Sequence, residues 1–341
     1  MNFKSTTSPT PCALSLLKAT RWATASLALC LSALPVLAQT PAAYPNKTIR
    51  LVLGYAPGGV ADITARLVAQ KLSESLGQSV IVENKPSAGG IVAAETVAKA
   101  DPDGYTLLHM NFGNAVSAAL FRKLPFDIQR DFAPISAMGY FDLVMLADKS
   151  ADFQTVQEFI GKAKANPDKY TLGSISLGSG QYMAAALFQS LAGLQKTPLV
   201  PYKTTPSVML ALKSKDLSVA FEIITPSLPL LRSGEIKALA VSSKQRFRGL
   251  PDVPTMAESG LKTYDVTAWN GIAAPAKTPR AIIERLNKEI NAVLALPEVR
   301  TKFQEVGIDA RGGTPEQLRD TLASGIDGWN ALIDEMKIER Q

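Results

Sequence analysis

Nine residues between a predicted strand and a predicted helix have the composition of an anion-binding turn. They are Gly54-Tyr55-Ala56-Pro57-Gly58-Gly59-Val60-Ala61-Asp62, and they follow the apolar run Ile49–Leu53 and precede the helical pattern Ile63–Leu76. Such a turn leaves backbone N–H groups unpaired at the positive end of the helix dipole, which suits an anion. A plain strand-to-helix turn without a ligand explains the same residues. We call residues 55–62 loop 1.

A second stretch repeats this arrangement and adds hydroxyl groups. It is Gly173-Ser174-Ile175-Ser176-Leu177-Gly178-Ser179-Gly180, again between a predicted strand and a predicted helix. Serine hydroxyls can donate hydrogen bonds to a carboxylate. If this stretch faces loop 1 across a cleft, the two can hold one anion from both sides. We call residues 174–181 loop 2.

Two carboxylates complicate a simple anion site. Asp62 lies in the first turn of the predicted helix, where it either caps that helix or meets a hydroxyl or ammonium group of the ligand. Glu222 ends the predicted strand Leu217–Ile223 and so either lines the cleft or is a surface carboxylate. The residues alone leave both questions open.

The sequence gives little indication of a catalytic site, a metal site or a cofactor site. Loop 2 is not a Gly-x-Ser-x-Gly nucleophile turn, and the single histidine, His109, lies inside a predicted strand. We find no metal-ligand spacing and no dinucleotide Gly-x-Gly-x-x-Gly motif. The prediction is a protein that is not an enzyme and has no cofactor and no metal. Trp269 is interpreted as packing in preference to cleft wall.

Residues 1–38 have the pattern of a secretory signal. Lys4, Lys18 and Arg21 form a basic region, 22–37 is uncharged and apolar, and Val36-Leu37-Ala38 offers a cleavage site after Ala38. This predicts a periplasmic location in a Gram-negative cell. A lipoprotein anchored through Cys30 is the alternative, which the bulky Leu29 before it disfavours.

The predicted mature chain is nearly neutral and lacks cysteine. Both cysteines, Cys12 and Cys30, lie within the first 38 residues, as do three of the 36 basic residues, leaving 33 basic against 30 acidic. Without a basic cluster interleaved with aromatic residues, nucleic acid is not an expected partner. About 300 residues can bury a large core, usually as two domains.

Apolar runs alternate with helical patterns along the mature chain, which predicts an α/β fold with parallel strands. Further strands are predicted at 79–82, 105–110, 170–175, 199–202 and 238–242, and helices at 156–165, 181–191, 206–213, 278–296 and from 314. A short helix is predicted from the capping-box spacing of Thr255 and Glu258. Two extended stretches, 135–147 and 264–274, are predicted to carry the chain into a second domain and back, which makes a hinge. Domain 1 is expected to comprise 44–140 plus 275–341, and domain 2 to comprise 141–274.

Several segments together resemble one family. They include Tyr44-Pro45-Asn46-Lys47-Thr48-Ile49-Arg50, Ala56-Pro57-Gly58-Gly59, Val82-Glu83-Asn84-Lys85-Pro86, Asp103-Gly104-Tyr105-Thr106-Leu107, Leu124-Pro125-Phe126-Asp127, Val200-Pro201-Tyr202-Lys203 and Leu250-Pro251-Asp252-Val253-Pro254-Thr255. In order and spacing they resemble the extracytoplasmic solute receptors of tripartite tricarboxylate transporters, the Bug family.

The resemblance implies a venus-flytrap periplasmic binding protein whose two α/β domains hold a carboxylate between loop 1 and loop 2. It implies a small carboxylated metabolite as ligand, integral-membrane transporter subunits as partners, and a monomer. The ligand-binding residues it implies are Tyr55, Ala56, Gly58, Gly59, Asp62, Asn111, Ser174, Ser176, Gly178, Ser179, Gln181, Tyr202 and Glu222. The sequence departs from the family pattern at Tyr55, Asn111–Asn114, Tyr182, Thr204 and Glu222, which leaves the identity of the ligand open.

Two other functions are compatible with the sequence. A receptor that senses the solute and docks on a signalling partner predicts the same cleft. An exported enzyme requires a catalytic set that the sequence does not assemble.

Overall fold

The computed structural model describes residues 1–2, 44–175, 179–335 and 337–341. Residues 44–341 form one compact unit. The predicted signal, apart from its first two residues, lies outside the described part, as do Ser176 and Gly178 of loop 2. No helix in the described part is long and apolar enough to cross a membrane.

The strands of the described residues pair in one sheet in the order β2-β1-β3-β9-β4-β7-β5-β6, and β8 and β10 also pair with β4. Their bounds are β1 (Ile49–Leu53), β2 (Val80–Asn84), β3 (Thr106–Asn111), β4 (Phe132–Asp148), β5 (Leu172–Ile175), β6 (Leu199–Tyr202), β7 (Val219–Ile223), β8 (Ile236–Val241), β9 (Thr267–Pro275) and β10 (Ile308–Ala310). The pairs β1–β2, β1–β3, β5–β6 and β5–β7 are parallel. The predicted α/β fold with parallel strands is therefore confirmed.

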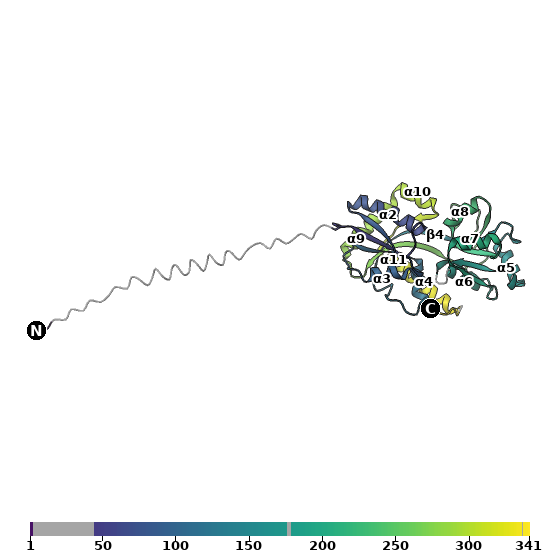
Figure 1. The fold of residues 1–341 in the computed structure, drawn as a ribbon, viewed down its shortest axis with the longest axis horizontal. Coiled ribbons are helices and arrows are strands. Elements are labelled where there is room, and N and C mark those ends of the chain that lie inside the picture. The colour runs from purple at the N-terminus through teal and green to yellow at the C-terminus, as the bar shows by residue number, and fades with distance from the viewer. Residues whose placement is uncertain (3–43, 176–178, 336) are drawn as a thin grey trace. The chain divides into compact units, whose positions relative to one another are not determined.

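Helices connect these strands. Their bounds are α2 (Val60–Leu76), α3 (Ile91–Ala98), α4 (Phe112–Leu120), α5 (Val156–Ala165), α6 (Gly180–Leu191), α7 (Thr205–Ser214), α8 (Ile224–Arg232), α9 (Arg280–Ala295), α10 (Pro297–Glu305) and α11 (Pro315–Glu335). In Figure 1, α2, α3, α9 and α10 gather at one end of the sheet and α5 to α8 at the other, with β4 between them. Short 3-10 turns at 88–90 and 167–169 complete the helical elements.

The strand β4 joins the two ends of the sheet. Its residues 132–142 pair with β9 and its residues 139–141 also pair with β10, whereas residues 143–148 pair with β7 and β8. The stretches predicted as extended, 135–147 and 264–274, thus correspond to β4 and β9. They also pair with each other, antiparallel, so the two crossings are adjacent strands.

The buried apolar side chains form separate clusters along the sheet. The largest combines β1, β3 and β9 with α2, α9 and α11 and includes Leu51, Val68 and Leu286. Two further clusters cover opposite faces of β7, because alternate residues such as Phe221 and Ala220 point to different sides. A fourth, smaller cluster joins α4, α6 and α11.

One predicted helix is absent from the structure, and two helices of the structure were not predicted. Residues 255–260 form turns and not a helix, although the predicted capping-box bonds between Thr255 and Glu258 are present. The left-handed Gly260 (φ 97°) ends the turn before a helix can propagate. The helices α4 and α10 were not predicted, because Gly113 and Asn114 are poor helix formers and α10 follows α9 after a single residue, Leu296.

Candidate ligand-binding site

Loop 1 connects the buried end of β1 to the start of α2 and presents an open helix N-terminus. Gly59 is the N-cap residue, so the first turn of α2 has no N-cap side chain that accepts a hydrogen bond from it. Residues 56–59 are exposed. A Cβ atom placed on Gly59 would come no closer than 3.8 Å to another atom, the carbonyl oxygen of Ala56. Free N–H groups and open space therefore coincide here, as an anion site requires.

The starts of α4, α6 and α7 differ from the start of α2 in this respect. Side chains of Asn111, Ser179 and Thr204 cap the starts of α4, α6 and α7 by accepting from backbone N–H groups. Each of these caps satisfies one donor that an external anion would otherwise use. Among these four helices, α2 is the one whose first turn remains available.

Asp62 is fully engaged inside loop 1. Its Oδ2 accepts from the Gly58 N–H at 2.9 Å and from Arg66 Nε at 3.0 Å, and its Oδ1 accepts from Asn84 Nδ2 at 2.9 Å. Burial opposes ionisation, but the hydrogen bonds from Arg66, Gly58 and Asn84 outweigh it and lower the pKa of Asp62. Gly58 adopts φ 84°, which glycine accommodates at no steric cost. Asp62 thus holds the shape of the loop.

Tyr55 links loop 1 to the end of β3. Its hydroxyl donates to Asn111 Oδ1 at 2.9 Å, and the same oxygen accepts from the Gly113 N–H at 2.8 Å. Burial raises the pKa of Tyr55 to about 12, so the phenol is neutral and acts as the donor. Tyr55 and Asn111, two of the predicted ligand-binding residues, therefore join the ends of β1 and β3.

Two glycines bring the connection after β2 against the residue that precedes loop 1. A Cβ atom on Gly54 would lie 2.5 Å from the Cα atom of Gly90, so the two backbones touch. Gly90 has φ 70° and precedes α3. The three parallel strand ends of this side thus form one packed edge around Tyr55.

Loop 2 is described at its two ends. Ser174 is fully buried and donates to the carbonyl oxygen of Ile175 at 3.0 Å. Ser179 donates to the same carbonyl and accepts from the Tyr182 N–H, both at 3.0 Å. The hydroxyl protons of Ser174 and Ser179 are therefore used within the loop. Gln181 is buried in the first turn of α6.

The start of α6 lies against the start of α4. A Cβ atom on Gly180 would fall 1.6 Å from Cε2 of Phe112, so the ring of Phe112 occupies the space that Gly180 leaves free. Phe112 directly follows Asn111, the partner of Tyr55. The structure therefore brings the described end of loop 2 close to the residues that border loop 1.

Glu222 and Tyr202 belong to the same edge of the sheet as loop 2. Glu222 is completely buried, and its Oε2 accepts from Thr205 Oγ1 at 3.1 Å and from the Ile223 N–H at 3.3 Å. Burial raises the pKa of Glu222 to about 7, against the opposing hydrogen bonds from Thr205 and the Ile223 N–H. Tyr202 ends β6 and packs at the margin of the cluster on the α7 side of the sheet.

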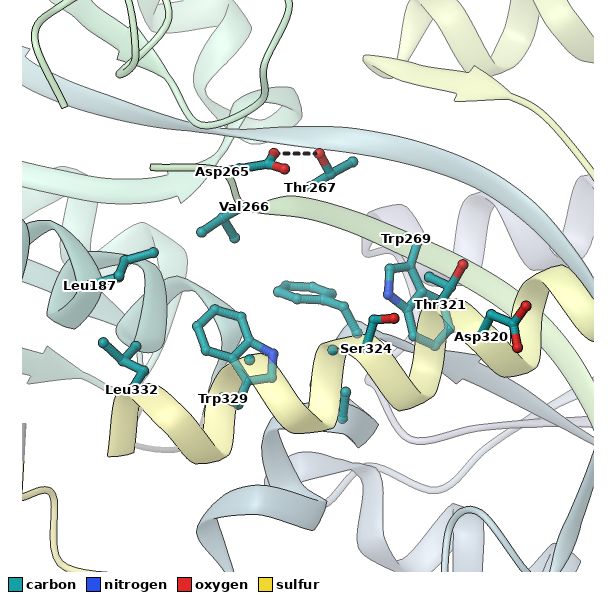
Figure 2. A pocket seen from close by; sticks show the side chains of 14 residues that line it. Leu187, Asp265, Val266, Thr267, Trp269, Asp320, Thr321, Ser324, Trp329 and Leu332 are labelled. Atoms are coloured by element: carbon teal, nitrogen blue, oxygen red, sulfur yellow. Dashed lines mark hydrogen bonds between the residues drawn. The ribbon is translucent and has the colours of Figure 1, made fainter. Parts of the chain in front are cut away.

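Two cavities lie beside the crossing strands. One, of about 560 Å³, is bounded by α4, α6, α11 and β9, and Figure 2 shows Trp269 and Trp329 at its wall and a hydrogen bond between Thr267 and Asp265. The other, of about 670 Å³, lies between Tyr140 of β4 and the basic segment 244–248. Among the described residues, no predicted ligand-binding residue lines either cavity. Trp269 is 3% exposed and packs in the largest cluster.

Sequence reasoning missed three residues that organise the site. Asn84 donates to the Tyr55 carbonyl and to Asp62 and accepts from Arg66. It belongs to Val82–Pro86, one of the segments that resemble the family, so the sequence did point to it. Thr205 follows a capping threonine and contacts Glu222. Phe112 offered no signal, because its contact with α6 depends on tertiary structure.

This arrangement of parallel strand ends and helix N-termini beside two adjacent crossing strands is that of a solute-binding protein. Residues 64–338 match the family described as tripartite tricarboxylate transporter family receptor, and the chain belongs to this family.

Relatives agree with this assignment. The UPF0065 protein in the tcbD-tcbE intergenic region of Pseudomonas sp. (strain P51) is 33% identical over 315 residues, which are 92% of this chain and 94% of the relative. The periplasmic binding protein BugD is 30% identical, with a TM-score of 0.77 over 87% of this chain and 100% of that chain. The predicted periplasmic-binding-protein fold is therefore confirmed.

Two further structures of this kind contain ligands. MatC from Rhodopseudomonas palustris with bound malate is 30% identical, with a TM-score of 0.75 over 85% of this chain and 100% of that chain. An R. palustris protein with adipate is also 30% identical, with a TM-score of 0.78 over 87% of this chain and 99% of that chain. Both ligands are carboxylates.

Proposed function

We propose that this protein captures a small carboxylated metabolite in the periplasm and delivers it to a membrane transporter of the tripartite tricarboxylate type. The observation that carries the proposal is the uncapped first turn of α2 behind the exposed residues 56–59. Free N–H groups at a helix N-terminus attract a carboxylate through both hydrogen bonds and the helix dipole. The malate and adipate complexes of related proteins support the same ligand class.

In this proposal loop 1 binds the carboxylate of the ligand, and the start of α6 faces loop 1. Tyr55 and Asn111 fix the edge of the site, and Asp62 keeps loop 1 in shape through the Gly58 N–H. Ala56 and Gly59 contribute the approach to the backbone, since both are exposed and a Cβ atom on Gly59 would meet no atom closer than 3.8 Å. Ser176 and Gly178 remain predicted contacts from loop 2.

The two ends of the sheet act as two domains in this proposal. Domain 1 comprises 44–140 and 275–341, and domain 2 comprises 141–274. The separate clusters of buried side chains support this division, and β4 and β9 are the adjacent strands about which a hinge could turn. Closure around the ligand then presents the loaded surface to the transporter.

A thermal unfolding screen of organic, amino and aromatic acids tests capture. A ligand at 100 times its dissociation constant adds about 2.7 kcal/mol to the free energy of unfolding, which gives a clear rise in melting temperature. Flat curves across the whole panel would overturn the proposal. Pull-down from membranes with the loaded and the empty protein tests delivery, since transport predicts recovery of transporter subunits and sensing predicts a signalling protein.

A further inference from the structure

Glu222 has a hydrogen-bonding capacity that its surroundings do not use. The side chain is completely buried at the carboxyl end of β7. Its Oε2 accepts from Thr205 and from the Ile223 N–H. Its Oε1 has no hydrogen-bond partner among the described residues. A buried carboxylate oxygen without a donor costs free energy, and native structures keep few such atoms without a reason.

The starts of three helices surround this carboxyl group. Thr205 begins α7, Ile224 begins α8 directly after β7, and Gln181 lies in the first turn of α6. The Thr205 hydroxyl and the Ile223 N–H donate to Glu222, the Gln181 side chain helps to lower its pKa, and none of these groups is charged. Helix N-termini favour an anion. At this end of the sheet that anion is the carboxylate of Glu222.

Asp62, in contrast to Glu222, has no carboxylate oxygen without a hydrogen-bond donor. Its two oxygens accept from Gly58, Arg66 and Asn84, so its acceptor capacity is spent. Of the two carboxyl groups predicted in the site, Glu222 is the one with an acceptor to offer.

A short series of contacts connects Glu222 to loop 1. Gln181 is one of the groups that lower the pKa of Glu222, and its neighbour Gly180 lies against Phe112. Asn111, next to Phe112, binds the hydroxyl of Tyr55 at the base of loop 1. These contacts place the start of α6, and with it the surroundings of Glu222, beside the residues that border loop 1.

We propose that Glu222 accepts a hydrogen bond from an N–H group of the ligand, so that the preferred ligand is a monocarboxylate with an amide or ammonium group at its far end and not a dicarboxylate. This inference rests on the proposed function and names the substrate class of that same site. A second carboxylate would face the Glu222 carboxylate with like charge, which disfavours binding. An N–H donor would satisfy Oε1.

Isothermal titration with matched ligand pairs tests this inference. Succinate, glutarate and adipate are each compared with their half-amides, which differ only in replacing one carboxylate by an amide. At about pH 8, where Glu222 is mainly ionised, we expect the wild-type protein to bind the half-amide of its best chain length at least about tenfold more tightly than the diacid. Equal or tighter binding of the diacid overturns the inference.

The variant Glu222→Gln supplies the second comparison. Its side-chain amide can donate to a carboxylate, so we expect the preference to shift toward the diacid by at least about tenfold. Glu235→Gln is the matched control, because Glu235 is an exposed partner of Lys213 in the same half of the protein and should leave the ratio unchanged. An unchanged ratio in Glu222→Gln overturns the inference even if the wild type prefers half-amides.

The pH dependence of the wild-type ratio gives a readout that needs no variant. Below about pH 7, Glu222 gains a proton and can donate to a second carboxylate, so the preference for half-amides should shrink. The groups named from α6, α7 and α8 do not titrate, whereas burial raises the pKa of Asp142, on the strand β4 that pairs with β7, to about 6. The change in ratio between about pH 8 and about pH 7 is therefore the part that belongs to Glu222, and a ratio that stays constant over this range counts against the inference. Binding of diacids alone removes this inference and leaves carboxylate capture intact. Absence of binding by every ligand to every variant overturns the proposed function, and this inference with it.

Discussion

Replacing Asp62 should change both stability and ligand binding, because its side chain holds loop 1 in shape. In Asp62→Ala, the Gly58 N–H, the Asn84 amide and Arg66 lose their common acceptor. We expect a loss of about 1–3 kcal/mol in the free energy of unfolding, together with weaker ligand binding, because loop 1 loses its shape. Urea denaturation and titration measure the two effects. Glu74→Ala in the same helix, at an exposed pair with Lys71, should change neither by much.

The same variant has a defined pH dependence. The pKa of Asp62 is lower in the folded protein than in the unfolded chain, so the stability it contributes is present above the unfolded pKa and is lost as pH falls through the folded pKa. The stability gap between the wild type and Asp62→Ala should therefore narrow in acid. A gap that widens below about pH 4 would contradict the assigned role.

For Glu222 we expect the opposite dependence of the free energy of unfolding on pH. Its pKa rises from 4.5 to about 7 on folding, so the folded protein keeps a proton that the unfolded chain has released between these values. The free energy of unfolding therefore falls as pH rises through this window, by up to about 3 kcal/mol at roughly 1.4 kcal/mol per pKa unit. Glu222→Gln should lack this decline and be more stable than the wild type at about pH 8. Parallel pH curves for the two proteins would exclude this assignment.

The residue types in the site could be predicted from the sequence, but their hydrogen-bond partners could not. The Pro-Gly-Gly turn indicated an open helix N-terminus, and the structure places one there. The spacing of Asp62 allowed both capping and ligand contact, and only the position of Asn84 on the adjacent strand decides where its oxygens bind. Ser174 and Ser179 were predicted as donors to a ligand, yet each donates to the Ile175 carbonyl.

At the scale of the elements, strands and long helices followed from local pattern, while α4 depended on its surroundings. β1, α5 and β6 have the predicted bounds, because their apolar spacing and flanking turns agree. The helix α4 begins with a reciprocal bond between Asn111 and Asn114 and is stabilised by packing of Phe112 and Val116. Its intrinsic helix propensity is low, so tertiary contacts decide its formation.

The start of α2 allows a test of the anion site at the level of the helix. Gly59→Asp places a good N-cap residue where glycine now stands, so stability should be unchanged or a few tenths of a kcal/mol higher. The new carboxylate would occupy the free N–H groups and repel the ligand carboxylate. We expect affinity to fall at least about a hundredfold, or about 2.7 kcal/mol, in a titration with the best acid of the panel.

The uncharged variant Gly59→Asn separates the two effects. Asparagine caps the helix as well as aspartate does but brings no charge, so its loss of affinity should be clearly smaller. Unchanged affinity in Gly59→Asp would remove loop 1 from the site, whatever the stability of the variant.

At the scale of the whole molecule, the double crossing was visible in the sequence, whereas the contacts between the two ends of the sheet were not. Two long extended stretches indicated β4 and β9, because few other patterns run for so many residues without a turn. The sequence did not show that α11 extends from Leu318 in the largest cluster to Leu332 in the cluster shared with α6. If the hinge turns, α11 must slide against one of these two clusters, since closely packed side chains do not deform continuously.

Thr225 offers a way to measure that motion. Its hydroxyl, at the start of α8, donates to the carbonyl oxygen of Val306 at the end of α10, and so joins the two ends of the sheet. If the hinge opens, this bond exists only in the closed state. Thr225→Val should then shift the equilibrium toward the open state by about 1 kcal/mol and weaken ligand binding about fivefold, with a larger radius of gyration in solution scattering. Thr321→Val, which removes a bond within α11 alone, is the matched control. If Thr225→Val lowers unfolding stability but leaves affinity and radius unchanged, the two ends of the sheet form a rigid body, and capture must occur without closure.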